Sequence, residues 1–103
     1  MQLKRWFGDV IRERVIVEFE TFTGDGEDKP LKRIGAPYEI GVNQKKFETY
    51  VRLLVTHEEN DKGEVVKVEG DKPKYRTVPL HKILEDSHKR RRDLEYTQPE
   101  HLK

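Results

Sequence analysis

Four consecutive cations, Lys89-Arg90-Arg91-Arg92, form the strongest local charge feature of the sequence. Lysine and arginine side chains bind phosphate groups through charge-assisted hydrogen bonds, and a run of them attracts a nucleic-acid backbone. The same run would also suit a solvated helix end, where cations complement the helix dipole or pair with nearby carboxylates. Those carboxylates would be Glu85, Asp86, Asp93 and Glu95. The sequence therefore indicates a phosphate-binding candidate and a structural alternative to it.

Three tyrosines, Tyr38, Tyr50 and Tyr75, fall in segments that favour strands, and small groups of cations lie near them in the sequence. Barrel surfaces that combine aromatic rings with cations can stack bases and follow the backbone of a single strand. Tyrosine is also common at the edge of a core, where its ring is packed and its hydroxyl is solvated. The cations concerned are Lys29, Lys32, Arg33, Lys45 and Lys46.

Nucleophilic or metal-dependent catalysis finds little support in the sequence. Ser87 is the only serine, and its neighbour His88 would not face it in a helix. His57-Glu58-Glu59 could offer metal ligands at a strand end, but no spacing matches a zinc pattern, and the acidic residues within 25–28 lack the register of a calcium loop. We therefore expect a protein without enzymatic activity, metal or cofactor.

The composition limits the size and the setting of the protein. With 103 residues, of which 33% are hydrophobic and 40% charged, the chain suits one domain with a thin core. Lysine and arginine number 21 against 20 aspartate and glutamate, so any electrostatic attraction must be local. The absence of cysteine, of a long apolar run and of a signal-peptide pattern predicts a cytoplasmic protein. We expect residues 1–88 to form a single globular domain and residues 89–103 a basic, partly flexible tail.

Hydrophobic periodicity predicts the elements that would position these residues. Residues 3–14 place apolar side chains at helical spacing, which predicts a short amphipathic helix. Residues 46–57 alternate most clearly and should form the central strand, with Phe47 and Val51 on the same face. A glycine and a proline within 31–42 indicate a bulged or bent strand. The other strands are expected over 15–22, 64–69 and 75–78.

A helix, about five short strands joined by tight turns and a final helix together predict the fold class. We expect a mainly β (α+β) protein: a small five-stranded antiparallel SH3/Sm-like barrel, or a strongly curved sheet, with an N-terminal helix and a C-terminal helix. Pro79 suits the first turn of that last helix, and Leu80, Ile83 and Leu84 continue at helical spacing. An open α+β sheet with both helices on one face is the alternative.

Three segments resemble, in order, the WYL domain family. They are IRERVIVEF (11–19), KRIGAPYEI (32–40) and YRTVPLHKIL (75–84). The aromatic-aliphatic trio that names the family is replaced by residues 47–51, and Lys82 stands where the family usually has arginine. The resemblance, over about residues 11–84, implies an Sm-like barrel and a ligand-sensing domain. It also implies that Arg33, Arg52 and Arg76 receive an anionic or nucleotide ligand.

Two classes of function follow from these features. In the first, the chain is a non-catalytic, nucleic-acid-associated regulatory or accessory module. In the second, it is a protein-protein interaction module, either a complex subunit or a small inhibitor of a larger protein. Such a module could also form homo-oligomers. That module would use Trp6 and Phe7 if the first helix leaves them exposed, whereas a packed helix would place both in the core. No membrane partner is expected. The residues predicted to contact nucleic acid are Arg76, Lys89, Arg90, Arg91, Arg92, Tyr50 and Tyr75.

Overall fold

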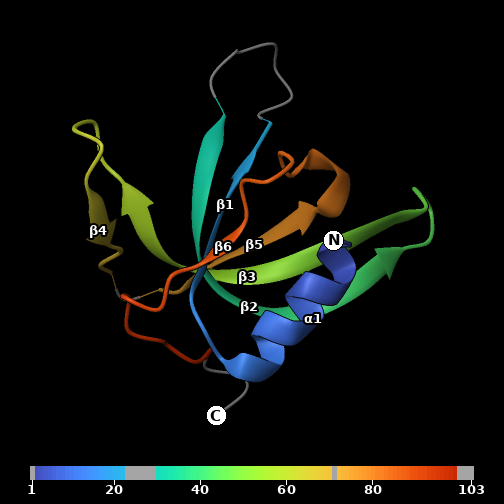
Figure 1. Ribbon diagram of the computed structural model, residues 1–103, viewed down its shortest axis with the longest axis horizontal. Helices are drawn as coiled ribbons and strands as arrows, with labels where there is room; N and C mark the ends of the chain where they lie inside the picture. The colour runs from blue at the N-terminus through green and yellow to red at the C-terminus, as the bar shows by residue number, and fades with distance from the viewer. Residues whose placement is uncertain (1, 23–29, 71, 100–103) are drawn as a thin grey trace.

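The computed structural model describes residues 2–22, 30–70 and 72–99, which form a curled antiparallel sheet and one α-helix (Figure 1). That helix, α1 (Leu3–Glu13), occurs where the apolar spacing predicts it, and it buries Trp6, Phe7 and Val10 on one face. It ends at Arg14, whose backbone is left-handed (φ 56°) and donates its N–H to the carbonyl oxygen of Val10 at 3.0 Å. The N-terminal helix is therefore confirmed.

The sheet is built around β3, as its alternation predicts. The strands are β1 (Val17–Thr21), β2 (Leu31–Asn43), β3 (Glu48–Glu59), β4 (Val65–Lys67), β5 (Lys74–Pro79) and β6 (Lys89–Arg90). β3 pairs with β2 along one edge and with both β4 and β5 along the other. β1 lies beyond β2, and β6 pairs with β1, so the strand order is β4-β3-β2-β1-β6 with β5 added on β3.

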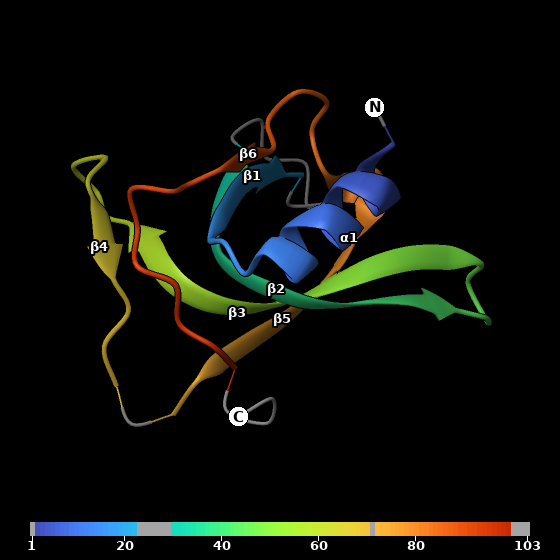
Figure 2. The same cartoon turned by 60° about the horizontal axis from the view of Figure 1, so that its bottom comes forward.

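Two register shifts bend the long β2–β3 ribbon, and they occur at the glycine and the proline that predict a bulged strand. One lies between Ile34 and Gly35, and the other spans Pro37 to Glu39. A Cβ atom at Gly35 would lie 2.1 Å from the backbone oxygen of Leu54, so the two strands approach too closely there for any other residue. The resulting sheet is a half-barrel, with α1 on its concave side (Figure 2). A curved antiparallel sheet is thus confirmed.

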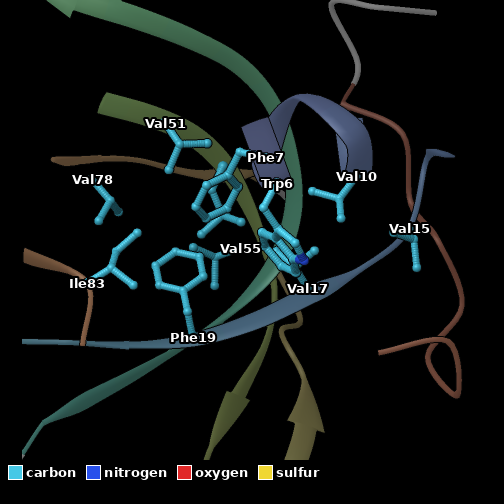
Figure 3. Close-up of a cluster of buried hydrophobic side chains, with 11 residues drawn as sticks. Trp6, Phe7, Val10, Val15, Val17, Phe19, Val51, Val55, Val78 and Ile83 are labelled. Carbon is cyan, nitrogen blue, oxygen red and sulfur yellow. The ribbon is translucent and has the colours of Figure 1, made fainter. Parts of the chain in front are cut away.

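The concave side of the sheet and α1 enclose the larger hydrophobic cluster (Figure 3). The ring of Phe7 meets that of Phe19 edge to face at a centroid distance of 5.5 Å, and Trp6 meets Phe7 at 5.0 Å. Val51 and Val78 from the sheet pack into the same cluster. Burial on this face stabilises the fold by roughly 1.5–3 kcal/mol for each large apolar side chain.

A second, smaller cluster lies on the convex side of the sheet. Ile16, Ile34, Ala36 and Leu54 form it. Leu94 and Tyr96, which follow β6, pack against it, and Pro99 is fully buried. The described part of the C-terminal segment therefore covers part of the convex face of the sheet.

The predicted C-terminal helix is wrong. After Pro79 the chain makes only a 3-10 turn, η1 (Leu80–Lys82), before Ile83 bridges to Thr21 of β1. The N–H of Leu84 then donates to the carbonyl of Glu20 at 2.8 Å. The helical spacing of 80–84 is too short to outweigh burial of Ile83 and these long-range backbone bonds.

Phe47 also differs from its predicted position. The sequence places it on the buried face of the central strand, but β3 begins at Glu48, and Phe47 lies in the turn before it with φ 53°. Its side chain is 91% exposed. This end of the β2–β3 hairpin projects away from the rest of the chain in Figures 1 and 2.

Candidate functional site

The basic run 89–92 lies beside α1 and β1, where carboxylates neutralise much of it. Arg90 of β6 makes a two-pronged contact with Glu13 at the end of α1, at 2.9 and 2.8 Å, and Arg92 reaches the same carboxylate at 3.1 Å. These cations lower the pKa of Glu13, chiefly through the hydrogen bond from Arg90. The Arg90 guanidinium also lies 5.6 Å from the centre of the Trp6 ring. Arg90 thus links β6 to the helix.

Arg91 is held still more firmly, between two carboxylates. One is Glu18 of β1, only 5% exposed, which Arg91 contacts at 2.5 Å. The other is Asp93, at 2.9 and 3.0 Å, and the hydrogen bond from Arg91 lowers the pKa of Asp93 to about 2. Lys89 approaches Glu18 at 3.4 Å and Lys32 lies 4.0 Å from it. The basic run is therefore largely an ion-pair network, as pairing with carboxylates predicts, but it lies at a strand and not at the predicted helix end, and of the predicted carboxylates Asp93 takes part.

The predicted tyrosine surface is present in part, on the convex side of β2, β3 and β5. The rings of Tyr38 and Tyr75 meet edge to face at 5.7 Å. Nearby, the guanidinium carbon of Arg52 lies 5.2 Å from the centre of the Tyr50 ring. The Arg52 guanidinium also pairs with Glu39 at 2.9 Å, on the exposed surface. Aromatic rings and a cation thus share this face, and a carboxylate partly offsets the cation.

Arg33 of β2 and Arg76 of β5 both lie on the concave side of the curl. Arg33 is paired across the sheet with Phe19, and Arg76 with Leu53. Directly paired residues of antiparallel strands share a face, and both partners are core residues, so the two arginines start from the core side. Burial and then the charge of Arg76 lower the pKa of Arg33, whereas Glu58 acts in the opposite direction.

One atom of Arg33 lacks the partner that its environment demands. Within residues 2–22, 30–70 and 72–99, its Nε is buried and has no hydrogen-bond partner. A buried donor without an acceptor costs about 1–3 kcal/mol, and a charged group costs more. The structure thus unites two of the three arginines that the WYL resemblance implies, while Arg52 lies on the opposite face of the sheet.

Trp6 and Phe7, the residues considered for a protein partner, are 4% and 0% exposed. The helix packs on the sheet and places both in the core, which leaves Phe47 as the most exposed aromatic side chain in the described residues. The exposed position of Phe47 was not predictable from alternation, because only the left-handed turn removes it from the strand.

Groups that could hold a metal are not seen in the part of the chain that the structure describes, where no cluster of three or more histidine, cysteine or acidic residues occurs. His57 instead contacts the Thr56 hydroxyl through Nδ1 at 2.8 Å, and Ser87 bonds the backbone of Glu20 and Leu84. The acidic loop 25–28 lies outside the described residues.

Comparison with known proteins gives no relative: no family model, no curated protein and no solved structure matches the chain. Among the described helices, none is long and apolar enough to cross a membrane.

Proposed function

We propose that the chain is a non-catalytic binding module for single-stranded nucleic acid, in which Arg33 and Arg76 hold a backbone phosphate. The observation that carries this proposal is the like-charged pair on the concave side, with a buried and unpartnered Nε on Arg33. An anion between the two guanidinium groups would offset their repulsion and satisfy that donor. Arginine suits the role because its planar fork matches the geometry of phosphate oxygens.

The tyrosines on the other face would add stacking. Tyr75 and Arg76 are consecutive in β5, so their side chains start on opposite faces of the sheet. Among the described strands β5 pairs only with β3, and a flexible single-stranded nucleic acid that passes over its other edge can touch both faces. Tyr38, in contact with Tyr75, extends the aromatic surface. We assign Arg90 and Arg91 of the basic run to holding the fold, because carboxylates already occupy them.

Binding of fluorescent single-stranded DNA and RNA, followed by anisotropy over a range of salt concentrations, tests the proposal. Replacing Arg76 or Arg33 with glutamine should weaken binding and reduce the slope of log affinity against log salt by about 0.7 for each lost phosphate contact. Arg5→Gln is the matched control, since it removes one charge from the exposed side of α1. No binding at low salt, or equal effects of all three variants, would contradict the proposal.

The SH3/Sm identity of the barrel and membership of the WYL family belong to the same proposal. The curled sheet and the placement of Arg33 and Arg76 on its concave side support it. A ligand-sensing role would use the same two arginines, and thermal-shift measurements with mononucleotides distinguish it from strand binding.

A protein-interaction module is the second candidate function, and Phe47 favours it. A phenylalanine that is 91% exposed offers an apolar anchor on a projecting hairpin, which also contains Val42 at 57% exposure. Its left-handed backbone conformation is uncommon for a residue with a large side chain. Nuclease-treated wild-type protein should then co-purify with a defined partner that Phe47→Ala fails to retain. Identical co-purification of both proteins would count against this candidate.

A further inference from the structure

A small pocket opens where β4 and β5 leave a gap along the same edge of β3. Val68 continues the pairing, with its N–H donated to the carbonyl oxygen of Thr56 at 2.9 Å, before the chain turns away through Gly70. Thr97 and Gln98 of the C-terminal segment close the pocket from the other side. Its volume is about 200 Å³. Most ligand pockets measure roughly 300–1,000 Å³, so this one suits a small group.

Lysines are the charged residues among the described residues that line this pocket. Its lining includes Lys67, Lys72 and Lys74, and no carboxylate among the described residues. Lys74 pairs with Glu58 at 3.1 Å, whereas Lys67 and Lys72 form no ion pair with any described residue. The Lys67 charge reaches His57, whose pKa is lowered first by burial and then by Lys67. Lys67 and Lys72, which make no ion pair with the described residues, repel each other beside one small space, and an anion would relieve that repulsion.

Polar groups and an apolar wall complete the lining. Thr56, Thr97 and Gln98 offer hydroxyl and amide groups, and Tyr75 contributes to one side. Leu54, buried on the convex side, closes the interior end. Lysine ammonium groups bind phosphate as point charges, without the paired geometry that arginine imposes. The pocket thus offers charge and hydrogen-bonding groups around a small volume.

We propose that this pocket binds a phosphomonoester, namely the terminal phosphate of the single-stranded nucleic acid that the protein binds. A backbone phosphodiester has one negative charge and a substituent on each side, so it cannot enter a small pocket end-on. A terminal phosphate has about 1.5–2 negative charges at neutral pH and three acceptor oxygens, which suits a pocket lined by lysines of which two make no ion pair with the described residues. The inference rests on the proposed nucleic-acid function, and Tyr75 joins the two sites because it lines the pocket and contacts Tyr38.

The first experiment uses inorganic phosphate as the probe, in protein that carries Arg33→Gln so that the concave arginine pair does not contribute. Sodium phosphate should raise the melting temperature above that in sodium chloride of equal ionic strength, because a ligand that binds the folded state stabilises it. The double variant Lys67→Gln/Lys72→Gln should lose this shift. The double variant Lys4→Gln/Lys62→Gln, which removes two exposed charges elsewhere, should keep it. No shift beyond that in chloride, or an equal loss in both variants, would overturn the proposal.

The second experiment compares oligonucleotides of one sequence that have a 5′-phosphate, a 3′-phosphate or only hydroxyl ends. The oligonucleotide with a phosphate at one particular end should bind roughly tenfold or more tightly than the hydroxyl-ended one, as expected for one or two additional charge-assisted hydrogen bonds. Lys67→Gln/Lys72→Gln should remove that increment and leave binding of the hydroxyl-ended strand unchanged. Equal affinity of all three strands overturns the pocket assignment while nucleic-acid binding stands. Phosphate binding without any binding of strands would instead overturn the proposed function.

Discussion

Glu18 is the residue whose removal should most disturb the fold, because it is a buried carboxylate at the centre of an ion-pair network. It is 5% exposed and lies within 4.0 Å of cationic groups on Arg91, Lys89 and Lys32. Glu18→Gln preserves the shape of the side chain and removes its charge. Arg91 keeps Asp93, so the effect should be near the lower end of that for breaking a buried pair. We expect a loss of about 3 kcal/mol in the free energy of unfolding.

Urea denaturation followed by Trp6 fluorescence measures this loss, since Trp6 is the only tryptophan and is 4% exposed. For a domain of this size, ~3 kcal/mol corresponds to a decrease of ~12 °C in melting temperature. Glu39→Gln is the matched control, because it removes a carboxylate that pairs with Arg52 at 2.9 Å on the exposed surface. The control should cost less than about 1 kcal/mol. Equal losses in the two variants would refute the view that burial makes the Glu18 network important.

Three further outcomes follow from the structure. Gly35→Ala should destabilise the fold by about 1–3 kcal/mol in urea, because the added Cβ would overlap the backbone oxygen of Leu54; unchanged stability would contradict the close approach. Acid should weaken the contact between Arg91 and Asp93, because the pKa of Asp93 is lowered from 3.8 to about 2. The contribution of this contact to the stability is therefore complete above pH 3.8 and is lost as the pH falls toward 2. An NMR titration of the Asp93 carboxyl that shows an ordinary midpoint would dismiss that contact. Phe47→Ser should leave the unfolding free energy within about 0.5 kcal/mol of wild type, as for other exposed positions, and a larger loss would mean that the side chain packs on the fold.

Local patterns predicted the elements whose partners are near in the sequence. Apolar spacing located α1, and alternation identified β3 as central, because each pattern reports directly on one buried face. The same reasoning failed at 80–84, where Ile83 pairs with Thr21 of β1, more than sixty residues earlier. Helical spacing within five residues contains no information about so distant a partner. The packing of Tyr96 against the convex cluster was not predicted for the same reason, since no periodic pattern precedes it.

The candidate site was only partly accessible from the sequence. The WYL resemblance grouped Arg33 and Arg76 with Arg52, but which of them share a face depends on the register of three strands and on the curvature at Gly35. The charge run 89–92 looked like the better site because adjacent cations are obvious in a sequence. Their acidic partners are less so: Glu13 and Glu18 lie more than seventy residues away and become neighbours only when β6 pairs with β1.

Arg33→Met tests the concave arginine pair most directly, because it replaces a half-buried guanidinium, whose Nε lacks a hydrogen-bond partner, with an apolar side chain of similar length. The decisive quantity is the affinity of this variant for a hydroxyl-ended single-stranded oligonucleotide at low salt, measured by calorimetry beside the wild-type protein. The melting temperature of the variant should be equal to or higher than that of the wild type. We predict a loss of at least roughly tenfold in affinity without any loss of stability. Wild-type affinity in a stably folded Arg33→Met protein would contradict the assignment of Arg33 and Arg76 as the phosphate-binding pair.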